Sequence, residues 1–101
     1  MALLDSTTRI VLNDRRWNFT RKLIKQRAAD GTRIYGTCDD PKSKNKSIVV
    51  DSRLSGEIEL DTIIHELLHA ASWEVFDDDF VDTTATSIAR ILHRLGYRKL
   101  S

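Results

Sequence analysis

Two histidines and a glutamate in the second half of the chain have the types and spacing of a metal-assisted hydrolytic site. His65, Glu66 and His69 occur in the segment HELLH. On an α-helix, residues four apart lie one turn apart on the same face, so both imidazoles can reach one ion. Zinc accepts neutral histidine nitrogen, and a catalytic zinc site uses three protein ligands and a water molecule. The spacing therefore predicts that His65 and His69 bind Zn²⁺.

Glu66 has the position of a catalytic base in such a site. Each helical residue advances by about 100°, so its carboxylate would lie beside the ion rather than on it. From there it can take a proton from a water molecule whose pKa the metal lowers to about 7, and pass it to a leaving amine. An HExxH string also occurs by chance, in a helix whose polar residues merely face the core or solvent. The amphipathic surroundings of this string favour the metal site.

Two helices are expected to carry these residues. Apolar residues at helical spacing predict a first helix from about Asp61 to Val75, with Asp61 as its N-cap. A second pattern predicts a helix from about Phe80 to Leu95, with Asp79 as N-cap and Gly96 in a left-handed C-terminal position.

The N-terminal half has the pattern of short strands. Arg9–Leu12, Thr32–Tyr35 and Ser47–Arg53 are candidate strands, and Asn13-Asp14 is a turn signal. Residues 15–24 fit either a strand or a helix. Strands followed by two helices predict an α+β domain, with a small antiparallel sheet packed against the HExxH helix and a C-terminal helix. The 101 residues suffice for a single domain spanning 1–101.

The stretch DTIIHELLHAASWEV resembles the active-site helix of zincin metallopeptidases, particularly the ImmA/IrrE-type peptidases and the SprT-like domains. The metzincin pattern is absent, because Ser72 and Val75 stand where it needs glycine and histidine. The resemblance implies a zincin-like fold and zinc-dependent hydrolysis of peptide bonds. It also implies a peptide or protein substrate extended along an edge strand, for which Ser47–Asp51 is the candidate.

The third zinc ligand is expected from the second helix. ImmA/IrrE-type proteins carry a ligand glutamate there in a pattern close to E-x-x-A-N-x-x-A, and this chain has D-T-T-A-T-S-I-A from Asp82. The resemblance thus implies Asp82 as the ligand, although Asp82 could instead supply acidity to the helix N-terminus. His93 is the rival that SprT-like domains suggest. Glu74 and residues 77–79 remain alternatives.

Composition and charge narrow the setting and raise an alternative function. The single cysteine, Cys38, favours a reducing intracellular (cytoplasmic) location, and no apolar run suits a membrane helix. Residues 1–50 carry a net charge of +6 and residues 51–101 a net charge of −5. Trp17 and Phe19 are interleaved with the basic residues of segment 15–27. The alternative is therefore a zincin-fold binding or regulatory module for a protein or nucleic acid, or a purely structural zinc site.

Overall fold

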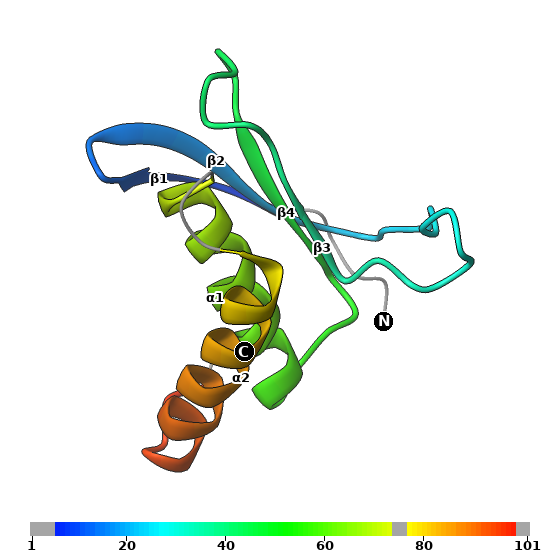
Figure 1. The fold of residues 1–101 in the computed structure, drawn as a ribbon, viewed down its shortest axis with the longest axis vertical. Helices are drawn as coiled ribbons and strands as arrows, with labels where there is room; N and C mark the ends of the chain where they lie inside the picture. Colours follow the sequence, from blue (N-terminus) through cyan, green and yellow to red (C-terminus); the bar gives the residue numbers. More distant parts are fainter. Residues whose placement is uncertain (1–5, 74–76, 99–101) are drawn as a thin grey trace.

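The computed structural model describes residues 6–73 and 77–98 as an α+β domain in which two helices lie on one side of a four-stranded sheet (Figure 1). Helix α1 contacts strands β3 and β4, and α2 packs on α1 rather than on the sheet. The elements are β1 (Ser6–Leu12), β2 (Arg15–Lys22), β3 (Gly36–Cys38), β4 (Ser47–Asp51), α1 (Gly56–Ala71) and α2 (Asp78–Arg94).

The sheet is mixed, so the expected antiparallel sheet is wrong in one pairing. The strand order is β1-β2-β4-β3, with antiparallel outer pairs and a parallel central pair of β2 and β4. Each antiparallel pair is formed by strands consecutive in the chain. The parallel pair joins strands separated by residues 23–46, and such a long-range pairing leaves no turn signal in the sequence.

The position of β4 in the sheet corrects a second expectation. Ser47–Asp51 was expected to be an edge strand, but it pairs with β2 on one side and β3 on the other. The strand beside the HExxH helix at the sheet edge is the short β3, Gly36–Cys38. The strand predicted at Thr32–Tyr35 is wrong, because these residues lie just before β3 and form only an isolated bridge, between Arg33 and Arg27.

The hairpin between β1 and β2 follows from its turn residues. Asn13 and Asp14 adopt φ values of 50° and 63°, and Leu12 pairs with Arg15 across the turn. Two consecutive residues with positive φ are the hairpin geometry that matches strand twist. The structure also decides between strand and helix for β2, because Trp17 and Phe19 alternate into the core at 2% and 8% exposure.

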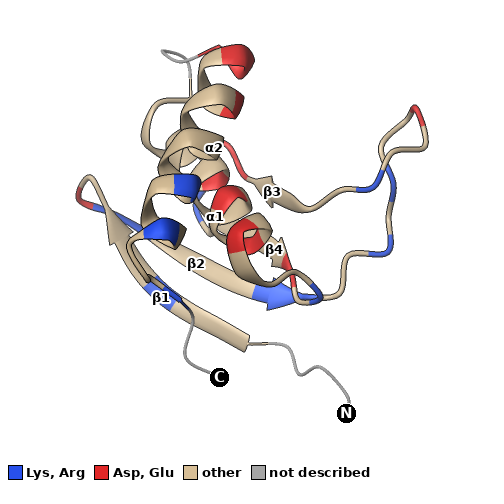
Figure 2. Cartoon of the chain, turned by 90° about the horizontal axis from the view of Figure 1, so that it is seen from below, with Lys and Arg blue, Asp and Glu red and all other residues tan. Residues whose placement is uncertain are grey.

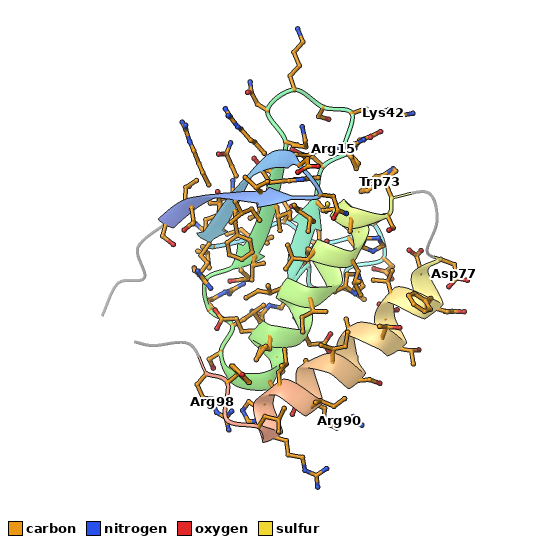
Figure 3. All side chains as sticks on the ribbon, turned by 90° about the vertical axis from the view of Figure 1, so that its left-hand side faces the viewer. Arg15, Lys42, Trp73, Asp77, Arg90 and Arg98 are labelled. Atoms are coloured by element: carbon orange, nitrogen blue, oxygen red, sulfur yellow. The ribbon has the colours of Figure 1, made fainter. Side chains whose placement is uncertain are left out.

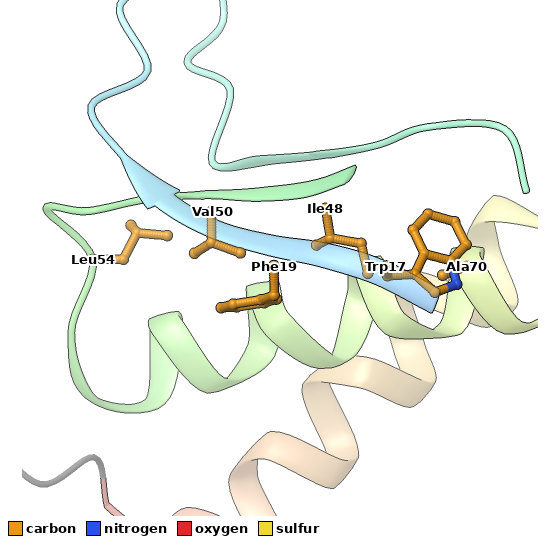
Figure 4. Close-up of a cluster of buried hydrophobic side chains, with 6 residues drawn as sticks. All are labelled: Trp17, Phe19, Ile48, Val50, Leu54 and Ala70. Carbon is orange, nitrogen blue, oxygen red and sulfur yellow. The ribbon is translucent and has the colours of Figure 1, made fainter. Parts of the chain in front are cut away.

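The core lies between the sheet and α1. Its buried side chains come from β2, β4, the segment after β4 and the end of α1 (Figure 4): Trp17, Phe19, Ile48, Val50, Leu54 and Ala70. Ile48 and Val50 are 0% exposed. Because α1 covers this face, the HExxH segment is held between the core and the sheet edge.

Both helices begin earlier than the sequence pattern indicates. Helix α1 starts at Gly56, so Asp61 lies within it rather than at its N-cap; its expected end at Val75 lies outside the described residues. The N-cap of α2 is Asp77, whose Oδ1 accepts from the Phe80 N–H at 2.7 Å, and not Asp79. At its far end Gly96 has the expected positive φ of 97°. Neither of these two helices is long and apolar enough to cross a bilayer.

Candidate active site

The two histidines of the HELLH segment face each other on α1. His65 Nε2 and His69 Nε2 are 3.1 Å apart, and the ring centroids are 4.7 Å apart in an edge-to-face arrangement. Both side chains are partly buried. Burial, together with the neighbouring His65, lowers the pKa of His69. The fold therefore favours the neutral imidazole, which is the form that binds metal ions.

The separation of these nitrogens fits a shared zinc ion. With zinc–nitrogen distances of about 2.05 Å, two nitrogens 3.1 Å apart subtend about 100° at the ion, close to the tetrahedral angle. Among residues 6–73 and 77–98, no group of three or more His, Cys, Asp and Glu side chains is arranged to hold a metal ion. The pair thus accounts for two donor atoms, and the assignment of a third is a proposal.

Glu66 is a buried carboxylate beside this pair. It is 7% exposed, and its side chain forms no hydrogen bond or ion pair within the described residues. Burial raises its pKa to about 7. Its oxygens are not among the fully buried atoms without a hydrogen-bond partner, which in the described residues are Trp17 Nε1 and Ser52 Oγ. The carboxylate is therefore largely desolvated but open to a neighbouring cleft, where it can exchange a proton.

Gly36 on the edge strand allows β3 to lie directly against this carboxylate. A Cβ atom at position 36 would be 2.9 Å from Thr62 Cγ2 and 3.1 Å from Glu66 Oε2. Contacts this short force a neighbour to move, so glycine lets the backbone approach. The approach of Gly36 to Glu66 was not predicted from the sequence. The two residues are far apart in the chain, and only the position of β3 at the sheet edge brings them together.

Helix α2 brings two carboxylates to the histidines. Asp82 Oδ1 is 3.1 Å from His65 Nδ1, and Asp78 Oδ1 is 4.0 Å from His69 Nε2. Both carboxylates are exposed, at 67% and 91%. The structure therefore places Asp82 against the HELLH segment, where it contacts His65 through Nδ1 and not through the nitrogen that faces His69.

The other ligand candidates lie elsewhere or have another partner. His93 Nδ1 is 3.8 Å from Glu57 Oε1, in the first turn of α1 and two turns before His65. In Figure 3, Trp73 and Asp77 mark one end of the helix pair, and Arg90 and Arg98 mark the other. His93 belongs to that second end, away from the histidine pair. Asp77 caps α2, and Glu74 lies outside the described residues.

A cleft of about 510 Å³ opens beside these groups. Residues 33–36 form one wall, and the other comes from α1 and α2, including His65, Glu66 and Asp82. The cleft also exposes Asp61 and Thr86, whose side chains are hydrogen-bonded to each other at 2.9 Å. A substrate segment in this cleft would lie between the edge strand and the HELLH helix.

Comparison with protein-family models, with curated proteins and with solved structures gave no match for this chain. The chemistry of the site therefore follows from its own residues. Two facing imidazoles and a largely buried carboxylate with its pKa near 7 lie on one helix, and a second helix brings exposed carboxylates to the imidazoles. His65, Glu66 and Asp82 line the cleft.

Proposed function

We propose that the protein is a zinc-dependent hydrolase of zincin type that cleaves peptide bonds. One observation carries the proposal: His65 Nε2 and His69 Nε2 converge to 3.1 Å on the helix that carries Glu66, a largely buried carboxylate that lines the cleft and has no hydrogen bond among the described residues. Packing alone does not require two imidazoles and a desolvated carboxylate at this spacing.

The proposed chemistry assigns a separate role to each group. His65 and His69 hold Zn²⁺, which when bound lowers the pKa of a coordinated water molecule to about 7. Glu66 accepts a proton from water in the cleft and later donates it to the leaving amine. Burial raises the pKa of Glu66 to about 7 in the metal-free protein, and a bound cation would favour its ionised form, which is the form that accepts a proton.

The proposal is tested by replacing Glu66 with glutamine. Wild-type protein isolated without chelators should bind about one zinc per chain. Glu66→Gln should keep the zinc and lose hydrolysis of a casein-derived peptide mixture by about 10²- to 10⁴-fold. The control is Glu57→Gln, which makes the same change on the same helix but at the His93 end. Absence of zinc from the wild type, or full activity in Glu66→Gln, would overturn the proposal.

Asp82 is the proposed third ligand, and Asp78 is the competitor. Asp82 has the place in the helix that the zincin resemblance implies, and it already contacts His65. A carboxylate at Nδ1 can also orient a histidine that binds metal through Nε2, and losing that contact weakens metal binding by about 10- to 100-fold. Zinc affinities of Asp82→Asn and Asp78→Asn are compared, with Glu57→Gln, two turns before His65 on α1, as control. The larger loss shows which of the two carboxylates the zinc site depends on more.

The bound substrate is proposed to lie along β3. An extended peptide can add to an exposed sheet edge through backbone hydrogen bonds. β3 is the sheet edge next to Glu66, whereas the expected strand Ser47–Asp51 is internal. The outward-facing backbone donors of β3 belong to Gly36 and Cys38, because Tyr35 and Asp39 on either side bond to β4. Cys38→Pro removes one donor from this edge, and we expect it to raise KM for peptides without changing the zinc content.

A second candidate function, binding of nucleic acid, is favoured by a basic groove on the sheet. Its volume is about 430 Å³, and its lining includes four cationic side chains and no acidic one among the described residues: Arg9, Arg16, Lys44 and Lys46. Figure 2 shows basic residues along β1, β2 and the loops, with acidic residues mainly on the helices. Trp17 lines this groove but is only 2% exposed, and Phe19 is 8% exposed, so neither side chain is open for stacking on bases.

This second candidate makes its own prediction. Phosphate contacts release counterions, so affinity for a labelled oligonucleotide should fall steeply with salt. Arg16→Glu and Lys44→Glu should weaken binding, whereas Arg90→Glu, which makes the same charge change on α2, should not. Equal losses in all three variants, or binding that does not depend on salt, would reject the groove as a nucleic-acid site.

A further inference from the structure

Two side-chain contacts join α1 to α2 one helical turn apart. The first is His65 with Asp82, at 3.1 Å, and the second is Thr86 with Asp61, at 2.9 Å. Asp61 lies four residues before His65 on α1, and Thr86 lies four residues after Asp82 on α2. Because residues four apart share a helix face, both contacts belong to the same seam between the helices.

The side chains of Asp61 and Thr86 could each form a hydrogen bond within their own helix, but they bond to each other instead. Asp61 was expected to cap α1, but the helix begins at Gly56 and the carboxylate is directed to α2. A threonine inside a helix commonly bonds to the carbonyl four residues earlier in its own helix. The Thr86 hydroxyl instead donates to Asp61 Oδ2. Both groups thus serve the connection between the helices.

Packing around the seam makes the hydrogen bond sensitive to the position of α2. Val81, Ala85 and Ala89 on α2 are 0% exposed, and the small alanine side chains let the helices approach closely. Small apolar residues leave a helix free to rotate or slide slightly. A shift of one residue would turn α2 by about 100° and carry Asp82 away from His65. A directional bond one turn away opposes that movement.

We infer that Asp61 and Thr86 are positioning residues, which fix the rotation of α2 so that Asp82 faces His65. The predicted effect of these two residues on zinc affinity rests on the proposed function. The contact between His65 and Asp82 is present in the metal-free protein and can be measured without zinc. Neither residue is inferred to touch the metal ion.

The experiment replaces the hydroxyl while keeping the shape. Thr86→Val in the full chain removes the donor, Thr86→Ser restores it, and Thr83→Val makes the same chemical change at an exposed position of α2. We expect Thr86→Val to weaken zinc binding by about 10- to 100-fold, as for other residues that orient ligands. Thr86→Ser and Thr83→Val should bind zinc as the wild type does.

A double-mutant cycle separates positioning from general stability. Asp61→Ala should weaken zinc binding as Thr86→Val does, and the double variant should lose no more than either single variant. Urea unfolding of the metal-free proteins shows whether each variant is folded. Zinc affinity in Thr86→Val equal to that of wild type would overturn the inference, as would losses that add in the double variant or that simply follow the stability.

A readout without metal keeps the inference separate from the proposed function. Nitrogen chemical shifts of the His65 ring report which nitrogen carries the proton, and a hydrogen bond to Asp82 favours the proton on Nδ1. In chelator-treated protein, Thr86→Val should reduce this preference and Thr83→Val should not. If wild type binds no zinc but the shifts change as expected, only the proposed function fails. If zinc binds and the shifts do not change, only this inference fails.

Discussion

Two buried carboxylates in this domain have pKa values shifted in opposite directions. Asp51, at the end of β4, is 0% exposed, and its pKa is lowered to about 2, mainly by hydrogen bonds from Arg53. Glu66 is 7% exposed, and burial raises its pKa to about 7. Burial alone therefore does not decide the charge of a carboxylate. The difference lies in the partners that surround each group.

The partners also separate a structural role from a chemical one. Asp51 accepts from Arg53 Nη2 at 2.7 Å and from Arg33 Nη2 at 3.3 Å, and Arg53 also donates to the Ile24 carbonyl. These bonds tie β4 to the segment that follows β2. Glu66 has no such bonds among the described residues and borders a cleft instead. A carboxylate left ready to exchange a proton is typical of a reactive site.

The largest expected effect comes from removing the charge of Asp51. Asp51→Asn weakens the charge-assisted hydrogen bonds that the buried side chain accepts from Arg33 and Arg53 and should lower the free energy of unfolding by about 3 kcal/mol. Urea unfolding of the chelated protein measures the loss. Asp79→Asn, the same change at an exposed position of α2, is the control. A loss no larger than that of the control would show that the ion pairs around Asp51 contribute little.

A somewhat smaller effect is expected from acid. The folded pKa of Asp51, about 2, lies below the unfolded value of 3.8, so the ionised form stabilises the fold. Its contribution is present above about pH 5 and is lost as pH falls from about 4 to about 2, at a cost of about 2 kcal/mol. Unfolding measured across this range should show the stabilities of wild type and Asp51→Asn converging at low pH. Parallel curves would contradict the low pKa.

The smallest effect has the opposite sign. The folded pKa of Glu66 lies above the unfolded value of 4.5, so the preference of Glu66 for its neutral form lowers the free energy of unfolding as pH rises from about 4 to about 7. Glu66→Gln should raise the stability of metal-free protein at pH 8 by about 1 kcal/mol, less than the shift implies because the amide is also buried without a partner. At pH 4 the gain should vanish. A less stable variant at pH 8 would mean that Glu66 has a structural partner.

Much of the site could be predicted because it depends on spacing within one helix. His65, Glu66 and His69 needed only the helical repeat to be brought together, and the structure shows the two imidazoles facing each other. Helix boundaries were less certain. Three consecutive aspartates, Asp77 to Asp79, could each cap α2, and the local pattern does not choose among them; Asp77 was therefore missed as its cap.

The contributions from other elements could not be predicted in this way. The approach of Gly36 to Glu66 and the bond from Thr86 to Asp61 both join residues 25 or more positions apart. Their partners are selected by packing of the whole domain, which no local pattern encodes. The parallel pairing of β2 with β4 was missed for the same reason.

The amino-acid sequence by itself determined the α+β composition, the hairpin turn at Asn13 and Asp14, and the histidine pair on one helix face. Each of these follows from backbone preferences or from the helical period within a few residues. Only the tertiary structure decided the mixed sheet, the edge strand beside Glu66 and the opposite states of the two buried carboxylates. A pKa depends on every charge and dipole near the group, and those neighbours are assembled only when distant segments pack together.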